Sequence, residues 1–253
     1  MSTPQNAKWT LERVLARQDW SPALCSVTVS RGADFNFSAG QYTRLGLTQT
    51  DGSVVWRPFS MVSAPDAPHL EFFARLVPDG AFSCYLQSLA VGDEILVERL
   101  CYGFLTLEQF ATGHDLWLIS SGTGLGPFIS ILRAAHLWDV FKRVIVVHSV
   151  SYAHELAYCD ELLALCAQEP RLTYLPVVTR EALPEALSTR IPLLLTSGAL
   201  EEASAQPLTL EGSRIMVCGN PELTAEVRRV LTLRGFQPNR RATPGQLAFE
   251  KYW

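Results

Sequence analysis

The stretch DLWLISSGTGLGPFISILRAAHLWD, residues 115–139, decides how this chain folds. An apolar strand-like run leads into a turn with three glycines, Gly122, Gly124 and Gly126, and an apolar helix follows. Glycines at such a turn let the backbone approach a ligand closely, and the helix start offers unpaired N–H groups to an anion. The turn differs from the G-x-G-x-x-G fingerprint, so by itself it fits either an anion site or a tight turn without a ligand.

The rest of the C-terminal half repeats this alternation of strand and helix. Runs such as RVIVVHSV, residues 143–150, are almost continuously apolar, as in parallel strands that are covered on both faces. The alternation predicts a doubly wound parallel α/β domain, which binds ligands at the carboxyl ends of its strands. Strands are expected at 115–120, 143–150, 172–178 and 213–218, and helices at 127–139, 153–168 and 221–234.

The N-terminal half has a different pattern of six short runs rich in β-branched and aromatic residues. Turn signals such as Pro78-Asp79-Gly80 separate them, and one helix is expected at 81–90. This spacing predicts a six-stranded antiparallel Greek-key β-barrel. With a break near 108–114, we expect domains at 1–110 and 111–253. The six strands are expected at 9–18, 23–30, 42–48, 54–63, 69–77 and 93–100.

Composition and charge exclude several classes of protein. Hydrophobic residues make up 48% of the 253 residues and charged residues 18%, which excludes a disordered chain. No apolar run approaches the ~20 residues that span a bilayer. The first residues show no basic segment followed by an apolar core, so we expect a cytoplasmic protein. The net charge of −4 argues against a general nucleic-acid binder.

Several arginines are concentrated in one segment near the C-terminus. Residues 227–249 contain no Asp or Glu. This segment fits either a solvated surface or a patch for an anionic ligand or an acidic partner. The arginines in this segment are Arg228, Arg229, Arg234, Arg240 and Arg241.

The six cysteines show no C-x-x-C pair, so neither a zinc site nor an iron–sulfur site is expected, and we expect no metal. A disulfide framework is also not expected, given the cytoplasmic interpretation. Most of the six are expected to be small buried hydrophobic residues.

Three further stretches of the sequence contain residues that could bind a ligand together with the glycine turn. Arg57-Pro58-Phe59-Ser60 lies on an expected strand, and Met216-Val217-Cys218-Gly219-Asn220-Pro221-Glu222 joins a strand to a helix. The chain ends in Phe249-Glu250-Lys251-Tyr252-Trp253, although chain ends usually fray. Taken singly, the first fits an edge-strand arginine beside a core aromatic ring, and the second an ordinary strand-to-helix turn.

Together and in this order, these stretches resemble the bacterial ferredoxin/flavodoxin–NADP⁺ reductases. RPFS is similar to the R-x-[YF]-[ST] flavin motif of that family, VPDGAFS to its pyrophosphate turn, and GTGLGP to its G-T-G-x-x-P nicotinamide motif. VCGNP is similar to its late C-G motif and EKYW to its aromatic end. The resemblance covers essentially the whole chain. It implies an enzyme with FAD on the barrel and NADP(H) on the α/β domain.

The resemblance also implies particular residues for FAD. Arg57 would pair with the pyrophosphate, Phe59 would stack on the isoalloxazine, and Ser60 would lie near flavin N5. Thr123 would lie between flavin and nicotinamide. The full implied FAD set is Arg57, Pro58, Phe59, Ser60, Ala81, Phe82, Ser83, Thr123, Tyr252 and Trp253.

For NADP(H), the resemblance implies Arg180 and Arg190 at the 2′-phosphate, although either arginine alone also fits a surface ion pair. Relatives often have a third arginine where this chain has Ser151. This departure weakens the NADP assignment without reversing it, because two arginines and a hydroxyl can still neutralise a phosphate. No carboxylate is expected in the place where NAD sites bind the ribose diol. The full implied set is Val150, Ser151, Thr179, Arg180, Arg190, Asn220, Pro221, Glu222 and Glu226.

As catalytic residues the resemblance implies Ser60, Cys218 and Glu250, the last two as a polar lining. The implied partner of this expected monomer is an acidic ferredoxin or flavodoxin. Two alternatives stay open: a related flavin reductase that feeds a heme protein or an oxygenase, and a non-catalytic nucleotide-binding redox sensor.

Overall fold

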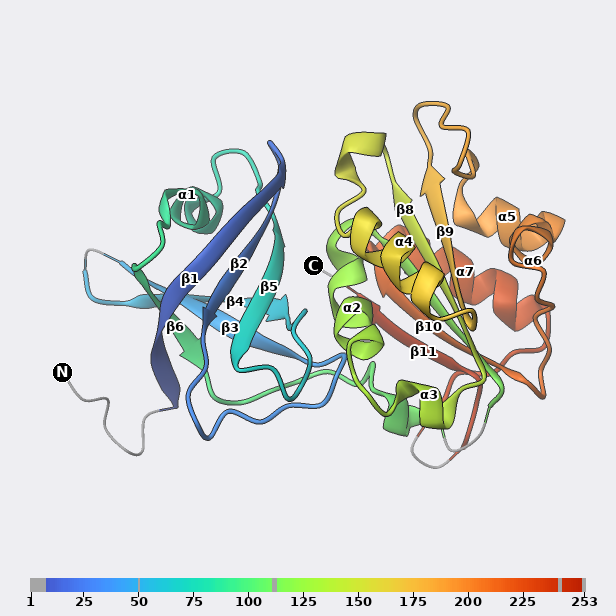
Figure 1. Ribbon diagram of the computed structural model, residues 1–253, viewed down its shortest axis with the longest axis horizontal. Helices are drawn as coiled ribbons and strands as arrows, with labels where there is room; N and C mark the ends of the chain where they lie inside the picture. Colours follow the sequence, from blue (N-terminus) through green and yellow to red (C-terminus); the bar gives the residue numbers. More distant parts are fainter. Residues whose placement is uncertain (1–7, 50, 111–112, 241–242, 252–253) are drawn as a thin grey trace. The chain divides into compact units, whose positions relative to one another are not determined.

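The computed structural model describes residues 8–49, 51–110, 113–240 and 243–251. The chain divides into two compact units, coloured along the sequence in Figure 1. Unit 1 comprises Met1–Thr106 and Gly126–Ala134, and unit 2 comprises Leu107–Leu125 and Ala135–Trp253. Each unit has its own buried apolar cluster.

Unit 1 is built on one antiparallel sheet in the order β4-β3-β6-β1-β2-β5. The edges of this sheet meet, because Met61, just after β4, bridges to Phe72 and the Val62 N–H donates to the Glu71 carbonyl at 2.8 Å. The predicted six-stranded barrel is therefore confirmed. Its strands are β1 (Trp9–Ser21), β2 (Leu24–Ser30), β3 (Tyr42–Thr48), β4 (Val54–Ser60), β5 (His69–Arg75) and β6 (Glu94–Glu98).

Helix α1 (Ala81–Ser88) follows the Pro-Asp-Gly turn, as predicted. Asp79 has φ +58°, a left-handed conformation that Asp tolerates better than most residues. Phe82 and Leu86, four residues apart on one helix face, join the apolar cluster of the barrel.

Helix α2 (Gly126–Leu132) belongs to unit 1, although the alternation of strand and helix had assigned it to the α/β domain. Ser130 Oγ donates to the Ser63 carbonyl at 2.8 Å, and Arg133 Nη1 lies 2.6 Å from Glu71 Oε2. The predicted helix over 127–139 is wrong in length, because α2 ends at Leu132 and a separate turn, α3 (Leu137–Val140), follows. The apolar pattern continues across this break, so the sequence did not indicate it.

Unit 2 contains a five-stranded parallel sheet in the order β11-β10-β7-β8-β9. The chain runs outward from β7 through β8 to β9 and then returns to the other side of β7, which is the doubly wound topology that the sequence predicts. The fifth strand, β11, was not expected. The strands are β7 (Asp115–Ser121), β8 (Arg143–Val150), β9 (Leu172–Val178), β10 (Ser213–Gly219) and β11 (Leu247–Lys251).

Helices cover both faces of this sheet, α4 on one side and α5, α6 and α7 on the other (Figure 1). This explains the continuous apolar runs: Trp117 packs toward α5–α7, and Leu118, next along β7, is buried on the opposite face. Among the described residues, no helix is long and apolar enough to cross a membrane. The helices are α4 (Cys159–Gln168), α5 (Ile191–Ser197), α6 (Ala199–Ser204) and α7 (Pro221–Leu233), and the short 3₁₀ turns are η1 (Leu107–Gln109), η2 (Gly122–Leu125) and η3 (Ala153–Glu155).

The expectation that most cysteines are buried is wrong. Cys25 and Cys218 are buried, Cys84 is exposed, and the other three are partly exposed. All six are free thiols. Cys84, Cys159 and Cys166 lie on short helices that cover the sheets from outside, where one face always meets solvent.

Candidate functional site

In unit 1, the RPFS stretch lies at the end of β4. The Arg57 side chain is exposed, and its Nη1 donates to the Trp56 carbonyl at 2.9 Å. Phe59 is half-buried, and its ring lies 5.5 Å from the ring of Phe82, centroid to centroid. The structure thus brings together two stretches that are more than twenty residues apart in the sequence, RPFS and the start of α1.

The start of α1 is open to an anion. Gly80 occupies the N-cap, no side chain caps the helix, and its first turn contains no acidic residue. The first N–H groups of a helix have no partner within the helix, and they attract negative charge. The Ser83 hydroxyl is already used inside the protein, since it accepts from the Val77 N–H at 2.8 Å. An exposed arginine and an uncapped helix start are both groups that can bind a pyrophosphate.

Ser60 is buried at the end of β4, beneath the first residue of α2. A Cβ built on Gly126 would lie 3.7 Å from the Cβ of Ser60 and 3.6 Å from Val62. These are ordinary van der Waals distances.

In unit 2, the residues expected to bind NADP(H) gather at one edge of the sheet. Parallel strands all end at the same edge, where α/β folds bind ligands, above all where the strand order reverses. Here the reversal is at β7, which has β8 on one side and β10 on the other. The residues at this edge include Thr123 after β7, Ser151 after β8, Arg180 after β9 and Asn220 after β10.

The glycine turn after β7 is packed tightly against the end of β10. A Cβ on Gly124 would lie 2.4 Å from the Cys218 carbonyl oxygen and 2.9 Å from the Gly219 nitrogen, so only glycine fits. Ser121 Oγ accepts from the Asn220 N–H at 3.2 Å, which joins the two turns. Asn220 Oδ1 in turn caps α7 by accepting from the Leu223 N–H at 2.7 Å.

Thr123 supplies evidence that this turn fits a ligand. Its side chain is buried, and its Oγ1 has no hydrogen-bond partner among the described residues. Buried hydroxyl groups in native proteins are normally hydrogen-bonded. A polar ligand group at this turn would satisfy the hydroxyl.

His148 contacts the same turn from β8, and no role for it was predicted from the sequence. It is fully buried on β8, and its Nε2 lies 3.1 Å from the Gly122 carbonyl oxygen. Burial lowers the pKa of His148 to about 4, so the ring is neutral near pH 7 and donates from Nε2 to the carbonyl. The available signal was a single polar ring inside the apolar run of β8.

We expect His148 to make the protein less stable in mild acid. Its folded-state pKa, about 4, lies below the unfolded value of 6.5, so the unfolded chain binds the proton first. The free energy of unfolding therefore decreases as the pH falls from 6.5 toward 4, by up to about 3 kcal/mol. His148→Gln keeps a donor for Gly122 and cannot titrate in this range. Urea unfolding across this pH range should show a smaller loss for the variant, and equal losses would contradict the assignment.

Cys218 and Glu250 are directly paired on β10 and β11. Burial raises the pKa of the Cys218 thiol well above its usual value, and the Glu250 carboxylate raises it further. The thiol therefore stays protonated, which fits a polar lining and argues against a nucleophile. Tyr252 and Trp253, which follow β11 in the sequence, lie outside the described residues.

Arg180 and Ser151 are neighbours at the ends of β9 and β8. The Arg180 N–H donates to the Ser151 carbonyl at 2.9 Å, and the guanidinium lies 5.9 Å from the centre of the Tyr152 ring. Thr179 Oγ1 donates to the Val150 carbonyl at 3.1 Å. Arg180 is exposed, so its charge is available to a ligand at this edge.

Arg190 has different surroundings. It occupies the N-cap position of α5, and its Nη2 lies 3.0 Å from Glu222 Oε1 and 3.6 Å from Glu226 Oε2. Both carboxylates belong to the first two turns of α7, and Pro221 is the first residue of that helix. The surface ion pair that was the alternative explanation for this arginine is therefore present.

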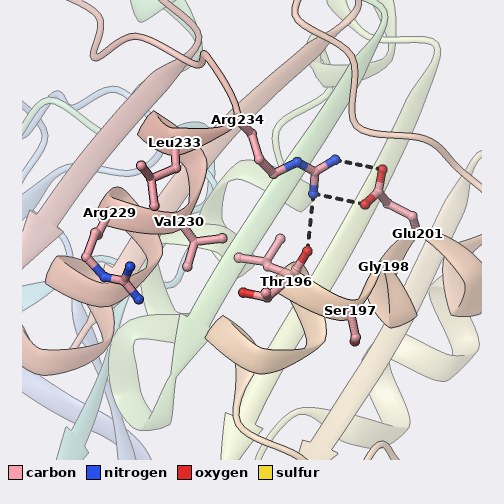
Figure 2. A pocket seen from close by; sticks show the side chains of 9 residues that line it. Thr196, Ser197, Gly198, Glu201, Arg229, Val230, Leu233 and Arg234 are labelled. Carbon is pink, nitrogen blue, oxygen red and sulfur yellow. Dashed lines mark hydrogen bonds and ion pairs between the residues drawn. The ribbon is translucent and has the colours of Figure 1, made fainter.

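Three arginines of the segment 227–249, Arg228, Arg229 and Arg234, have separate surroundings, and Arg241 lies outside the described residues. Arg234 binds both carboxylate oxygens of Glu201, at 2.9 and 3.0 Å, in a pocket of about 490 Å³ between α5, α6 and α7 (Figure 2). Arg228 lies over the Phe249 ring at 4.3 Å. Arg229 lines the same pocket without an ion pair in the part of the chain that is described. Arg234 is thus a structural residue.

Comparison with known proteins matches two parts of the chain to two kinds of domain. An oxidoreductase FAD-binding domain matches residues 21–99, and an oxidoreductase NAD-binding domain matches residues 118–229. The flavodoxin/ferredoxin–NADP reductase of Shigella flexneri is 38% identical over 98% of this chain and 100% of its own length. The ferredoxin–NADP reductase of Pseudomonas aeruginosa is 34% identical over 95% of this chain and 96% of its own length.

Among solved structures, the ferredoxin NADP⁺ reductase of Neisseria gonorrhoeae, with bound FAD and NADP, is similar over 97% of this chain and 99% of its own. The TM-score is 0.93 and the sequence identity 38%. A flavohemoglobin from Malassezia yamatoensis, 19% identical with a TM-score of 0.79, shares the fold. The chain belongs to the flavodoxin/ferredoxin–NADP reductase family.

Proposed function

We propose that this chain is an FAD-dependent ferredoxin/flavodoxin–NADP⁺ reductase. The observation that supports this most is the similarity over nearly the whole chain to a reductase solved with both FAD and NADP. The unpartnered Thr123 hydroxyl and the uncapped start of α1 agree with it, because each offers polar groups that a nucleotide ligand would satisfy. When bound, FAD takes a hydride from NADPH and passes electrons singly to the protein acceptor.

Unit 1 would hold the flavin. Arg57 would bind the pyrophosphate through its planar fork, which matches phosphate geometry better than lysine does. The N–H groups of Ala81 and Phe82 would bind the same group at the helix start. Phe59, backed by Phe82, would offer a flat apolar surface to the isoalloxazine, and Ser60 would lie at its edge.

Unit 2 would hold the dinucleotide along the carboxyl edge of its sheet. The Thr123 hydroxyl and the backbone of the glycine turn would meet the nicotinamide half, with the protonated Cys218 thiol and Glu250 as a polar lining. Thr179, Arg180 and the segment after β10 would meet the adenosine half. The electron acceptor would be a ferredoxin or a flavodoxin, because the names of the similar reductases include these two proteins. The chain would act as a monomer.

The test is carrier-dependent electron transfer by the purified, FAD-loaded protein. We expect NADPH to reduce cytochrome c only when a ferredoxin or flavodoxin is added, with a rate that saturates as the carrier increases. Ferricyanide serves as the control acceptor that needs no carrier. If the protein reduced ferricyanide but no ferredoxin or flavodoxin supported cytochrome c reduction, a reductase for another acceptor would be favoured. A protein that binds no FAD would favour a non-catalytic role.

A further inference from the structure

The position of Arg190 on the carboxyl edge follows from the chain just before it. Leu187 bridges to Val177 in the parallel sense, and the Val178 N–H donates to the Leu187 carbonyl at 2.8 Å. Since parallel segments advance together, residues 188–190 pass beyond the end of β9, and α5 begins there. Arg190 therefore reaches the ligand edge of the sheet on the face covered by α5 and α7.

Two carboxylates already surround the charge of Arg190. Glu222 and Glu226 are four residues apart on α7, so their side chains lie on one face of the helix. Both carboxylates approach the same guanidinium nitrogen, at 3.0 and 3.6 Å. One positive and two negative charges leave the cluster with a formal charge of −1. The Arg190 side chain is 55% exposed, so a ligand can reach it.

A 2′-phosphate would meet both attraction and repulsion at this cluster. The phosphate bears nearly two negative charges near pH 7, and the two carboxylates compete with it for the same arginine. The ribose 2′-hydroxyl of NAD(H) adds no charge and can donate to a carboxylate, the contact that NAD-binding sites use. Glu222 and Glu226 were expected along the nucleotide, but their ion pairs with Arg190 were not predicted from the sequence.

The other side of the predicted phosphate site offers little compensation. Ser151, at the end of β8, supplies a hydroxyl and no charge. Arg180 next to it forms no ion pair among the described residues. Arg180 is available to a phosphate, whereas the charge of Arg190 is already neutralised by two carboxylates. This pair binds a dianion less strongly than two or three unpaired arginines would.

We propose that Glu222 and Glu226 are specificity-determining residues that weaken the preference of this chain for NADP(H) over NAD(H). They do so by occupying Arg190 and by repelling the 2′-phosphate. This inference rests on the proposed function, because it assumes that the dinucleotide binds at this edge. It predicts a reductase that uses both dinucleotides, with a preference that two side chains control.

The test measures binding of two small probes by calorimetry. Adenosine 2′,5′-bisphosphate contains the 2′-phosphate, and 5′-AMP lacks it, so the ratio of their affinities isolates that group. Glu222→Gln is expected to tighten binding of the bisphosphate about fivefold, the effect of removing one unit charge about 4 Å away in water. Glu226→Gln is expected to act in the same direction, and the double variant more strongly than either. Binding of 5′-AMP should not tighten.

Glu202→Gln is the matched control, an exposed glutamate of α6 in unit 2 for which the described residues show no ion pair. It should bind both probes as the natural protein does. Unchanged or weaker binding of the bisphosphate in the double variant would overturn the proposal, and so would equal tightening of both probes. The measurement involves no electron transfer. If the probes bind as expected but no carrier-dependent reduction is found, the proposed function is refuted and this proposal is not.

Discussion

Replacing Gly124 by alanine is expected to reduce kcat/KM for NADPH at least about a hundredfold while FAD stays bound. The added Cβ would lie 2.4 Å from the Cys218 carbonyl oxygen and 2.7 Å from its carbon, and both are backbone atoms that no rotamer change can move. The turn would have to shift by most of an ångström away from β10. A displacement of that size at a substrate-positioning element costs on the order of a hundredfold in rate.

Gly126→Ala is the steric control for this prediction. Its Cβ would meet Val62, Ser60 and Phe73 at 3.6–3.8 Å, which is ordinary contact. We expect the control to retain most of its activity, measured as NADPH-dependent ferricyanide reduction. FAD content, read from the visible spectrum, should be equal in both variants. Comparable activity of Gly124→Ala and Gly126→Ala would show that the close approach to β10 has no part in binding the dinucleotide.

Replacing Arg57 by alanine is expected to weaken FAD binding about 10- to 100-fold. A hydrogen bond to a charged group contributes about 1.5–3 kcal/mol, and Arg57 would form such bonds with the pyrophosphate. In the structure its side chain is exposed and bonded only to the neighbouring Trp56 carbonyl in the described region, so the substitution leaves the barrel core intact. Titration of the apoprotein with FAD measures the effect.

Arg57→Lys keeps the charge and loses the planar fork, so it should bind FAD with intermediate affinity. Arg13→Ala removes an exposed arginine of β1 that donates to the Gly92 carbonyl, and it should bind FAD normally. If Arg57→Ala and Arg13→Ala bound FAD equally well, the pyrophosphate would have to lie elsewhere on unit 1.

The sequence predicted the strands well where packing imposes a clear pattern. β8 coincides with the expected range because burial on both faces makes it almost continuously apolar between polar loops. β9, at the edge of the sheet, also coincides with its expected range. The strand β11 and the helices α5 and α6 were not predicted. They have five to seven residues each, too few for a periodic pattern, and tertiary contacts decide their conformation.

The parts of the site that could be predicted are those that lie within single sequence motifs. Motifs at the ends of strands identify the carboxyl edge, because parallel strands must end together. Pairings between distant segments were not predictable, and Arg190 with Glu222, 32 residues apart, is the main case. The role of His148 depends on its Nε2 contact with the Gly122 carbonyl, which only the folded structure reveals.

Rapid anaerobic mixing of the FAD-loaded protein with NADPH shows whether this chain transfers a hydride from NADPH to FAD. We expect the visible absorbance of oxidised flavin to disappear in the natural protein, and at least about a hundredfold more slowly in Gly124→Ala. Persistence of the oxidised flavin spectrum in the natural protein, with NADPH in excess, would contradict the account.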